Sequence, residues 1–410
     1  MKHNNRLSRL SGLLFVALGC FISACSTTSS NAPTNNVVTT RIGVTQKSTG
    51  IQTPSTTTSN RTALPTQPLT QIRMTDAMHG WALDKNSVLK TSDGGVSWIN
   101  LTPNGAIVTP ATQAEFLNAQ DAWFTMPNEH ANTVTMFYTT TGGTTWNQSS
   151  IYEASPLGIA LTFINNQIGW FEVSPGGPGA GSEPVDIFRT TNGGMTWKKI
   201  ASSSDPQSGL PTGGDKSGLS FTDAQTGWAT GTVASNAPWL YVTHNGGITW
   251  STQSITGITS NAHTCYQTTP PVLMITPPVL IGTEGFLPMT VGISSSPCNV
   301  QPSTVLASTT DGGNTWSING QMIAPFQSSN LYVVNSLFAW ATDQKSGTLY
   351  QTQNGGKSWQ KIASNTGLSG PMSFVNENTG FATGQADQTI LKRTNDGGKT
   401  WQTISYQIHR

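Results

Sequence analysis

Short apolar stretches alternate with polar turns along residues 70–410, and no stretch shows the spacing of an amphipathic helix. In each of seven units an apolar residue stands seven positions before an aromatic residue, which directly follows Gly or Ala. This spacing fits two short strands joined by a polar turn. The seven pairs are Met74–Trp81, Phe116–Trp123, Phe163–Trp170, Phe221–Trp228, Val279–Phe286, Val333–Trp340 and Phe374–Phe381.

Each unit continues with the box Thr-x-[Asp/Asn/Thr]-Gly-Gly-x-[Ser/Thr]-Trp. The short polar side chain can bond nearby backbone N–H groups, the Gly pair supplies positive φ, and Trp offers a large apolar ring. We interpret the box acid as structural, because the second copy has Thr141 in its place. The other box residues at this position are Asp93, Asn192, Asn245, Asp311, Asn354 and Asp396, and the closing residues are Trp98, Trp146, Trp197, Trp250, Trp316, Trp359 and Trp401.

Every unit therefore predicts four short strands, and the units recur with a mean period of about 50 residues. Four strands in such a period are typical of a propeller blade. The sequence predicts an all-β fold, a single seven-bladed β-propeller over residues 70–410.

The box resembles the Asp-box, or BNR repeat, of sialidase-like propellers. The fuller unit, Phe-x₆-Trp-Ala…Leu-x-x-Thr-x-Asp-Gly-Gly-x-Thr-Trp, resembles the photosystem II stability/assembly factor family. This resemblance implies a non-enzymatic scaffold that binds a partner and needs no cofactor. It names no partner, because the repeated residues are those that build the blades.

Residues 1–24 read as an export signal, with a basic start followed by an apolar run. The signal ends in Ile22-Ser23-Ala24-Cys25, which resembles the lipobox of bacterial lipoproteins. The resemblance implies that Cys25 carries the lipid and becomes the mature N-terminus; the alternative is an ordinary cleaved signal. Residues 25–69 are rich in Ser and Thr and predict a disordered tether. We expect a protein anchored by lipid to the extracytoplasmic side of a cell membrane.

The long insertions fall on the predicted face that carries the second loops and the links between blades, and they cluster on blades three to five. Long loops on a rigid scaffold commonly carry function, so we expect a protein or glycan of the cell envelope to bind this face. The alternative is that its acids are ordinary solvated loop charges. The candidate residues are Tyr152, Glu172, Glu183, Asp186, Trp239 and Tyr266.

Two cysteines of the folded part, Cys265 and Cys298, also fall on this face. An exported protein favours a disulfide between them, and two free thiols are the alternative. No metal is expected, because two Cys without clustered His do not form a tetrahedral zinc site.

From Asp76 onward the chain has 19 acidic and 13 basic residues, so nucleic acid is not the expected ligand. We expect a monomer. The rival function is a glycosidase. The few arginines do not supply the triad of a sialidase, whereas a two-carboxylate glycoside hydrolase needs only two facing acids. Glu172, Glu183 and Asp186 fall in a Gly- and Pro-rich insertion, which we expect to hold catalytic groups poorly. The sequence therefore favours a non-enzymatic protein.

Overall fold

The computed structural model describes residues 62–153, 155–176, 179, 181–232, 239–257, 272–293, 300–318, 328–343, 346–384 and 389–410. Cys25, Cys265, Cys298 and Tyr266 lie outside these residues, and so does most of the expected tether. In the described part no helix is long and apolar enough to cross a membrane.

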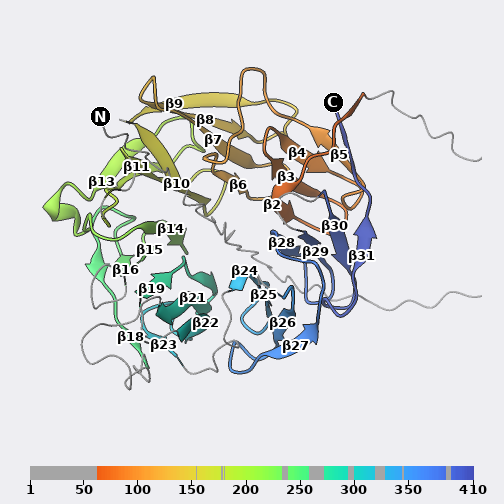
Figure 1. Ribbon diagram of the computed structural model, residues 1–410. Helices are drawn as coiled ribbons and strands as arrows, with labels where there is room; N and C mark the ends of the chain where they lie inside the picture. Colours follow the sequence, from red (N-terminus) through yellow and green to blue (C-terminus); the bar gives the residue numbers. More distant parts are fainter. Residues whose placement is uncertain are drawn as a thin grey trace, which may run out of the picture.

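Seven sheets are arranged in a ring (Figure 1), which confirms the predicted seven-bladed propeller. The strands of each blade are given in order from the ring axis outward. Blade 1 contains β2 (Leu69–Met74), β3 (Gly80–Asp84), β4 (Val88–Thr91) and β5 (Ser97–Asn100), and blade 2 contains β6 (Ala114–Phe116), β7 (Ala122–Asn128), β8 (Thr133–Thr139) and β9 (Asn147–Tyr152). Blade 3 contains β10 (Pro156–Phe163), β11 (Gly169–Pro175), β12 (Asp186–Thr190) and β13 (Lys198–Ser202).

Blades 4, 6 and 7 repeat the same four-stranded pattern. Blade 4 contains β14 (Lys216–Phe221), β15 (Gly227–Gly231), β16 (Leu240–Thr243) and β17 (Ser251–Thr252). Blade 6 contains β24 (Ser328–Val333), β25 (Ala339–Asp343), β26 (Leu349–Thr352) and β27 (Gln360–Ala363), and blade 7 contains β28 (Met372–Phe374), β29 (Gly380–Thr383), β30 (Leu391–Thr394) and β31 (Gln402–Ile404). A short 3₁₀ helix, Pro206–Ser208, lies in the link between blades 3 and 4.

Blade 5 is larger than the others. Its central strands β21 (Glu284–Ile293) and β22 (Val300–Thr309) are ten residues each, and β23 (Trp316–Ser317) follows. Two inner segments, β19 (Val272–Ile275) and β20 (Val279–Ile281), both pair with β21. The sequence predicted only the second of them. A further strand, β18 (Ile255–Thr256), pairs in parallel with β23 at the outer edge.

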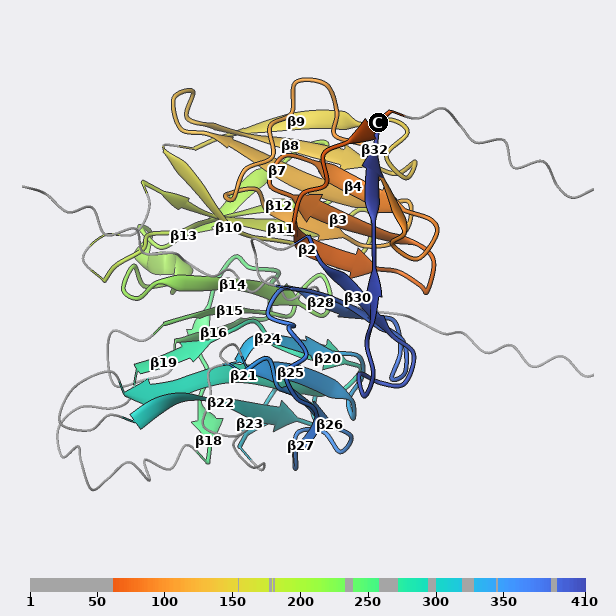
Figure 2. The same ribbon diagram turned by 45° about the vertical axis from the view of Figure 1, so that its right-hand side comes forward.

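Two strands from the ends of the described chain close the ring at blade 1. The strand β32 (Gln407–His409) pairs in parallel with β5, and β1 (Ala63–Leu64) pairs antiparallel with β32 (Figure 2). The segment around β1 was expected to belong to the tether. It is ordered as a strand because the C-terminal strand offers it a free edge.

The boxes form the turns that the sequence predicted. In the first, the carboxylate of Asp93 accepts the backbone N–H of Ser97 at 2.9 Å, and the Thr91 hydroxyl accepts the N–H of Gly95 at 3.0 Å. Both Gly residues have positive φ, 73° and 86°. The N–H of Gly94 also donates to the carbonyl of Met78, 2.8 Å away in the first turn of the same blade. Equivalent contacts in the other six blades place all boxes and first turns on one face, called here the box face.

Asp93→Ala should lower the free energy of unfolding by about 0.5–2 kcal/mol, as does loss of a similar side-chain bond to backbone N–H groups. Denaturant unfolding measures the change. Asp93→Thr is the matched control and should cost less, because in the second box the Thr141 hydroxyl accepts the N–H of Thr145 at 3.0 Å. An equal loss of unfolding free energy in Asp93→Ala and Asp93→Thr would contradict the prediction that these hydrogen bonds stabilise the turn.

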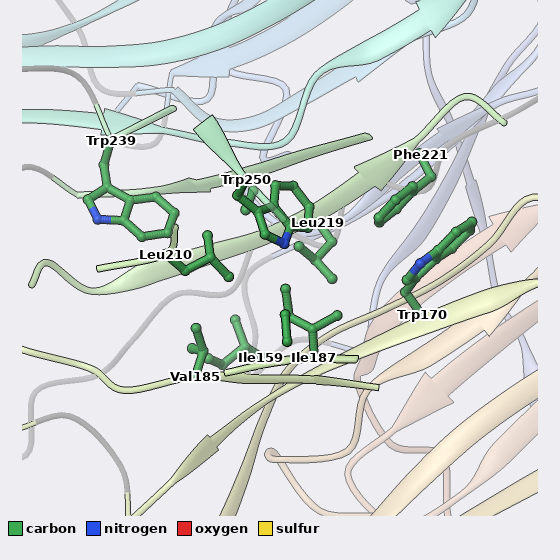
Figure 3. Close-up of a cluster of buried hydrophobic side chains, with 11 residues drawn as sticks. Ile159, Trp170, Val185, Ile187, Leu210, Leu219, Phe221, Trp239 and Trp250 are labelled. Carbon is green, nitrogen blue, oxygen red and sulfur yellow. The ribbon is translucent and has the colours of Figure 1, made fainter. Parts of the chain in front are cut away.

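Neighbouring blades are joined by aromatic stacks, one of which appears in Figure 3. There the ring of Trp170 in β11 lies 3.6 Å from that of Phe221 in β14, with the planes 3° apart. The Trp170 indole N–H also donates to the carbonyl of Gly246, at 2.9 Å in the box of blade 4. Arg189 lies over the other side of the indole and donates to the Ala224 carbonyl of blade 4. The two residues of each predicted pair therefore contact neighbouring blades: here the aromatic residue of blade 3 stacks on the apolar residue of the pair in blade 4.

Candidate functional site

The face opposite the boxes carries the second loops and the links, as the sequence predicted. In blade 3 the loop after β11 meets the link to blade 4, because the N–H of Glu183 donates to the carbonyl of Thr212 at 2.9 Å. We call this the loop face. Three of the predicted site residues, Glu172, Glu183 and Trp239, converge here between blades 3 and 4.

A residue that sequence reasoning missed, Lys216, joins this group. Its ammonium donates to the carbonyls of Thr212, Gly213 and Gly214, at 3.2, 3.0 and 2.7 Å. It also lies 4.5 Å from the ring centre of Trp239. Burial lowers the pKa of Lys216 to about 8, against the charges of the neighbouring acids. The backbone carbonyls therefore hold a buried cation beside the carboxyl groups.

The carboxyl of Glu183 is fixed at one oxygen. Its Oε2 accepts the backbone N–H of Lys216 at 2.6 Å. Burial raises the pKa of Glu183; the hydrogen bond from Lys216 opposes this rise, and the charge of Asp215 adds to it. Asp215 itself is exposed at the rim of the site. The link thus places Glu183, whose pKa burial raises, beside the exposed Asp215.

Glu172 lies behind this pair. It is fully buried in β11, and both of its carboxyl oxygens are without a hydrogen-bond partner. Burial raises the pKa of Glu172 to about 8; the charge of Glu183 raises it and that of Lys216 lowers it. At neutral pH Glu172 is therefore protonated, which avoids burying a second unpaired charge.

Trp239 and Tyr152 differ in their availability. Trp239 belongs to a buried cluster that includes Leu210 (Figure 3), and its ring lies 4.6 Å from that of the partly buried Tyr241. Its N–H donates to the Gly213 carbonyl at 2.8 Å. It supports the link and offers no open face to a ligand. The side chain of Tyr152 is 74% exposed at the end of β9, so it can meet a ligand.

Asp186 belongs to a separate group between blades 2 and 3. The ammonium of Lys199 contacts its carboxylate and lies 2.8 Å from that of Glu153. The partnered acids hold the outer strand of blade 3 against blade 2. We assign this group a structural role, because both carboxylates are engaged by the same lysine.

The expectation that Glu172, Glu183 and Asp186 are poorly held is wrong. Glu172 and Asp186 lie within strands β11 and β12, paired with Ile187 and Ser202 respectively. Glu183 lies in the loop but is bonded through its N–H and its carboxylate to the link. In the described part of the chain, no three His, Cys, Asp or Glu residues are grouped as metal ligands.

No protein-family model matches the chain, and no curated protein sequence matches it either. Solved structures do match. The chain is similar to the GH74 xyloglucanase from Xanthomonas campestris, with 12% identity, a TM-score of 0.56, and coverage of 85% of this chain and 55% of the xyloglucanase. This chain is a seven-bladed propeller. It spans about half the length of the xyloglucanase.

Lyases are also among the similar structures. An ulvan lyase of family PL25 matches with 10% identity and a TM-score of 0.45, covering 83% of this chain and 97% of the lyase. The oligogalacturonate lyase from Vibrio parahaemolyticus matches with 11% identity and a TM-score of 0.49, covering 78% and 86%. At these identities the similarity shows the fold alone.

The prediction of a non-enzymatic scaffold is contradicted by the comparison, since the GH74 xyloglucanase that shares this fold is an enzyme. The prediction depended on two arguments. The family resemblance used residues that build blades, and the poor mounting of the acids is overturned by their positions in the structure.

Proposed function

We propose that the protein cleaves glycosidic bonds in a polysaccharide, with Glu183 as proton donor and Asp215 as the second carboxylate. The observation that carries this proposal is the contrast between the two acids on the loop face. Glu183 is 5% exposed and burial raises its pKa, whereas its neighbour Asp215 faces solvent. Two carboxyl groups in unlike environments are what acid-assisted glycoside cleavage requires.

In this mechanism Glu183 protonates the glycosidic oxygen as the bond to the leaving sugar breaks. The carboxylate of Asp215 either attacks the anomeric carbon or removes a proton from the attacking water. The N–H of Lys216 fixes one oxygen of Glu183, and in this mechanism the other oxygen carries the proton. The ammonium of Lys216 stabilises the carboxylate that remains after proton transfer.

The similarity to a xyloglucanase supports a polysaccharide as substrate but does not identify it. The resemblance to the photosystem II assembly factor family offers no substrate either. The proposed location is the cell envelope, by way of the lipid on Cys25, where polysaccharides are accessible.

The experiment that tests the function is a release assay for reducing ends with neutral and acidic polysaccharides. Xyloglucan, arabinan and polygalacturonate are incubated with the wild type and with a Glu183→Gln/Asp215→Asn double variant. Release by the wild type alone, from at least one polysaccharide, is expected. Release from none of a broad panel, or equal release by the double variant, would overturn the proposal.

A further inference from the structure

The dipeptide Asn-Gly occurs five times in the chain, and the structure describes four of the copies in two kinds of setting. Three of them are the third and fourth residues of boxes, and one lies in the link between blades 1 and 2. The four copies are Asn104-Gly105, Asn192-Gly193, Asn245-Gly246 and Asn354-Gly355, and the fifth, Asn319-Gly320, lies outside the described residues.

Asn-Gly is a dipeptide whose backbone can attack its own side chain. The Gly nitrogen forms a bond to the Asn Cγ and loses its proton, the carboxamide nitrogen leaves as ammonia, and a succinimide ring results. Water then opens the ring at one carbonyl to give aspartate or at the other to give isoaspartate. Glycine favours ring closure, because it has no Cβ to obstruct the approach. The reaction requires that the backbone nitrogen and the carboxamide can both move.

In the box of blade 3 both reacting groups are held. The N–H of Gly193 donates to the carbonyl of Gln167 at 2.8 Å. The Asn192 carboxamide is bound at both ends by Thr196, whose N–H lies 3.0 Å from Oδ1 and whose hydroxyl lies 2.9 Å from Nδ2. The glycine is also crowded, because a Cβ on Gly193 would lie 2.7 Å from the carbonyl oxygen of Asn166. Ring closure there must first open these three hydrogen bonds.

The boxes of blades 4 and 6 hold their Asn-Gly copies in the same way. The Oδ1 of Asn245 accepts the N–H of Thr249 at 3.0 Å. The Oδ1 of Asn354 accepts the N–H of Ser358 at 2.9 Å. In both boxes the Gly N–H donates to a carbonyl of the first turn, at 2.8 and 3.1 Å. Asn354 is nevertheless exposed, so exposure alone does not release a box asparagine.

Asn104 and Gly105 occupy the centre of a turn that the N–H of Ala106 closes by donating to the carbonyl of Pro103 at 3.1 Å. Gly105 has a φ of 82°, as the third residue of a type II turn does. Both central residues are exposed, and a Cβ on Gly105 would meet no atom within 4 Å. No residue in the described part of the chain hydrogen-bonds to the Gly105 N–H or to the Asn104 carboxamide. The turn thus leaves both reacting groups able to move.

We propose that Asn104 is a site of spontaneous deamidation in the folded protein and that the box asparagines are protected from it. Both products add a negative charge to the link between blades 1 and 2, on the loop face. Isoaspartate also adds one atom to the path of the backbone. The link therefore changes with time without the action of an enzyme, and the inference does not depend on the proposed function.

The test follows deamidation of the full protein at neutral pH by peptide mapping with mass spectrometry, which separates aspartyl from isoaspartyl peptides. In the native protein Asn104 should react at least about 10-fold faster than Asn192, Asn245 and Asn354, because a hydrogen-bonded group reacts only after local opening. In denaturant the four should react at similar rates. Asn354 is the matched control within the same molecule, because it is exposed as Asn104 is. The peptide that contains Asn319 is measured separately.

A variant tests the reason for the protection. Thr196→Val removes the hydroxyl that accepts from Nδ2 of Asn192 and should raise the rate at Asn192 about 2- to 10-fold, the effect of losing one hydrogen bond. The rate at Asn104 should not change. Equal rates at Asn104 and Asn354 in the native protein would overturn the inference. Box asparagines that react as fast in the native protein as in denaturant, or an unchanged rate at Asn192 in Thr196→Val, would overturn the protection by hydrogen bonds.

Discussion

Glu183→Gln and Asp215→Asn are each expected to lower kcat about 10²- to 10⁴-fold on the polysaccharide that the wild type cleaves. Glu183→Gln removes the proton that is transferred to the leaving sugar. Asp215→Asn removes the negative charge that acts at the anomeric carbon. Because burial raises the pKa of Glu183, activity should persist to higher pH than with an ordinary glutamic acid. Initial rates from pH 4 to 9, with melting temperatures of each variant, measure both effects.

The matched control is Asp205→Asn, in the same link. Asp205 is exposed, and its carboxylate accepts the N–H of Gln207 at 2.9 Å, a bond that an Asn oxygen also accepts. Its activity should stay within about twofold of the wild type, because surface changes of this kind are nearly neutral. Loss of activity in Asp205→Asn, or full activity in either of the other two variants, would contradict the assignment.

Trp170→Ala should lower the free energy of unfolding by about 3–5 kcal/mol, the usual cost of emptying a buried aromatic site. The substitution removes the stack on Phe221, the bond to the Gly246 carbonyl and the support under Arg189. Guanidinium unfolding, followed by tryptophan fluorescence and circular dichroism, measures the loss.

Met195→Ala is the comparison, because Met195 occupies the variable position of the next box and is 59% exposed. Its cost should stay within about 0.5 kcal/mol. A similar cost for Trp170→Ala would mean that the blades are not held together through these aromatic stacks.

The repeat made the fold predictable. The residues that recur, such as Gly94, Gly95 and Trp98 in the first box, are those whose backbone angles and ring contacts build each blade. The extra strands of blades 1 and 5 were not predicted from the sequence, because two-residue strands such as β1 and β18 carry no periodic signal. They exist only because a partner strand far along the chain presents an edge.

The candidate site was predicted only in part. The variable loops lie on the loop face of blades 3 and 4, and Glu172, Glu183 and Trp239 converge there. Lys216 was missed, because a lone lysine has no motif and only the fold brings it to the acids. The hydrogen bond from Arg73 to Tyr332 was missed for a similar reason, because the two residues are 259 positions apart and only the fold brings them together.

The closure at blade 1 has a mechanical consequence. The N–H of Arg410 donates to the carbonyl of Thr62 at 3.0 Å, so the two ends of the described chain leave the ring side by side. A force that pulls on the chain before Thr62 would be carried by β1, then by β32 on the outside of blade 1 and by β2 on its inside. Blades 3 and 4 lie elsewhere on the ring (Figure 1) and would bear little of this load. Tension on a tether could thus strain the closing strands while Glu183 and Asp215 keep their positions.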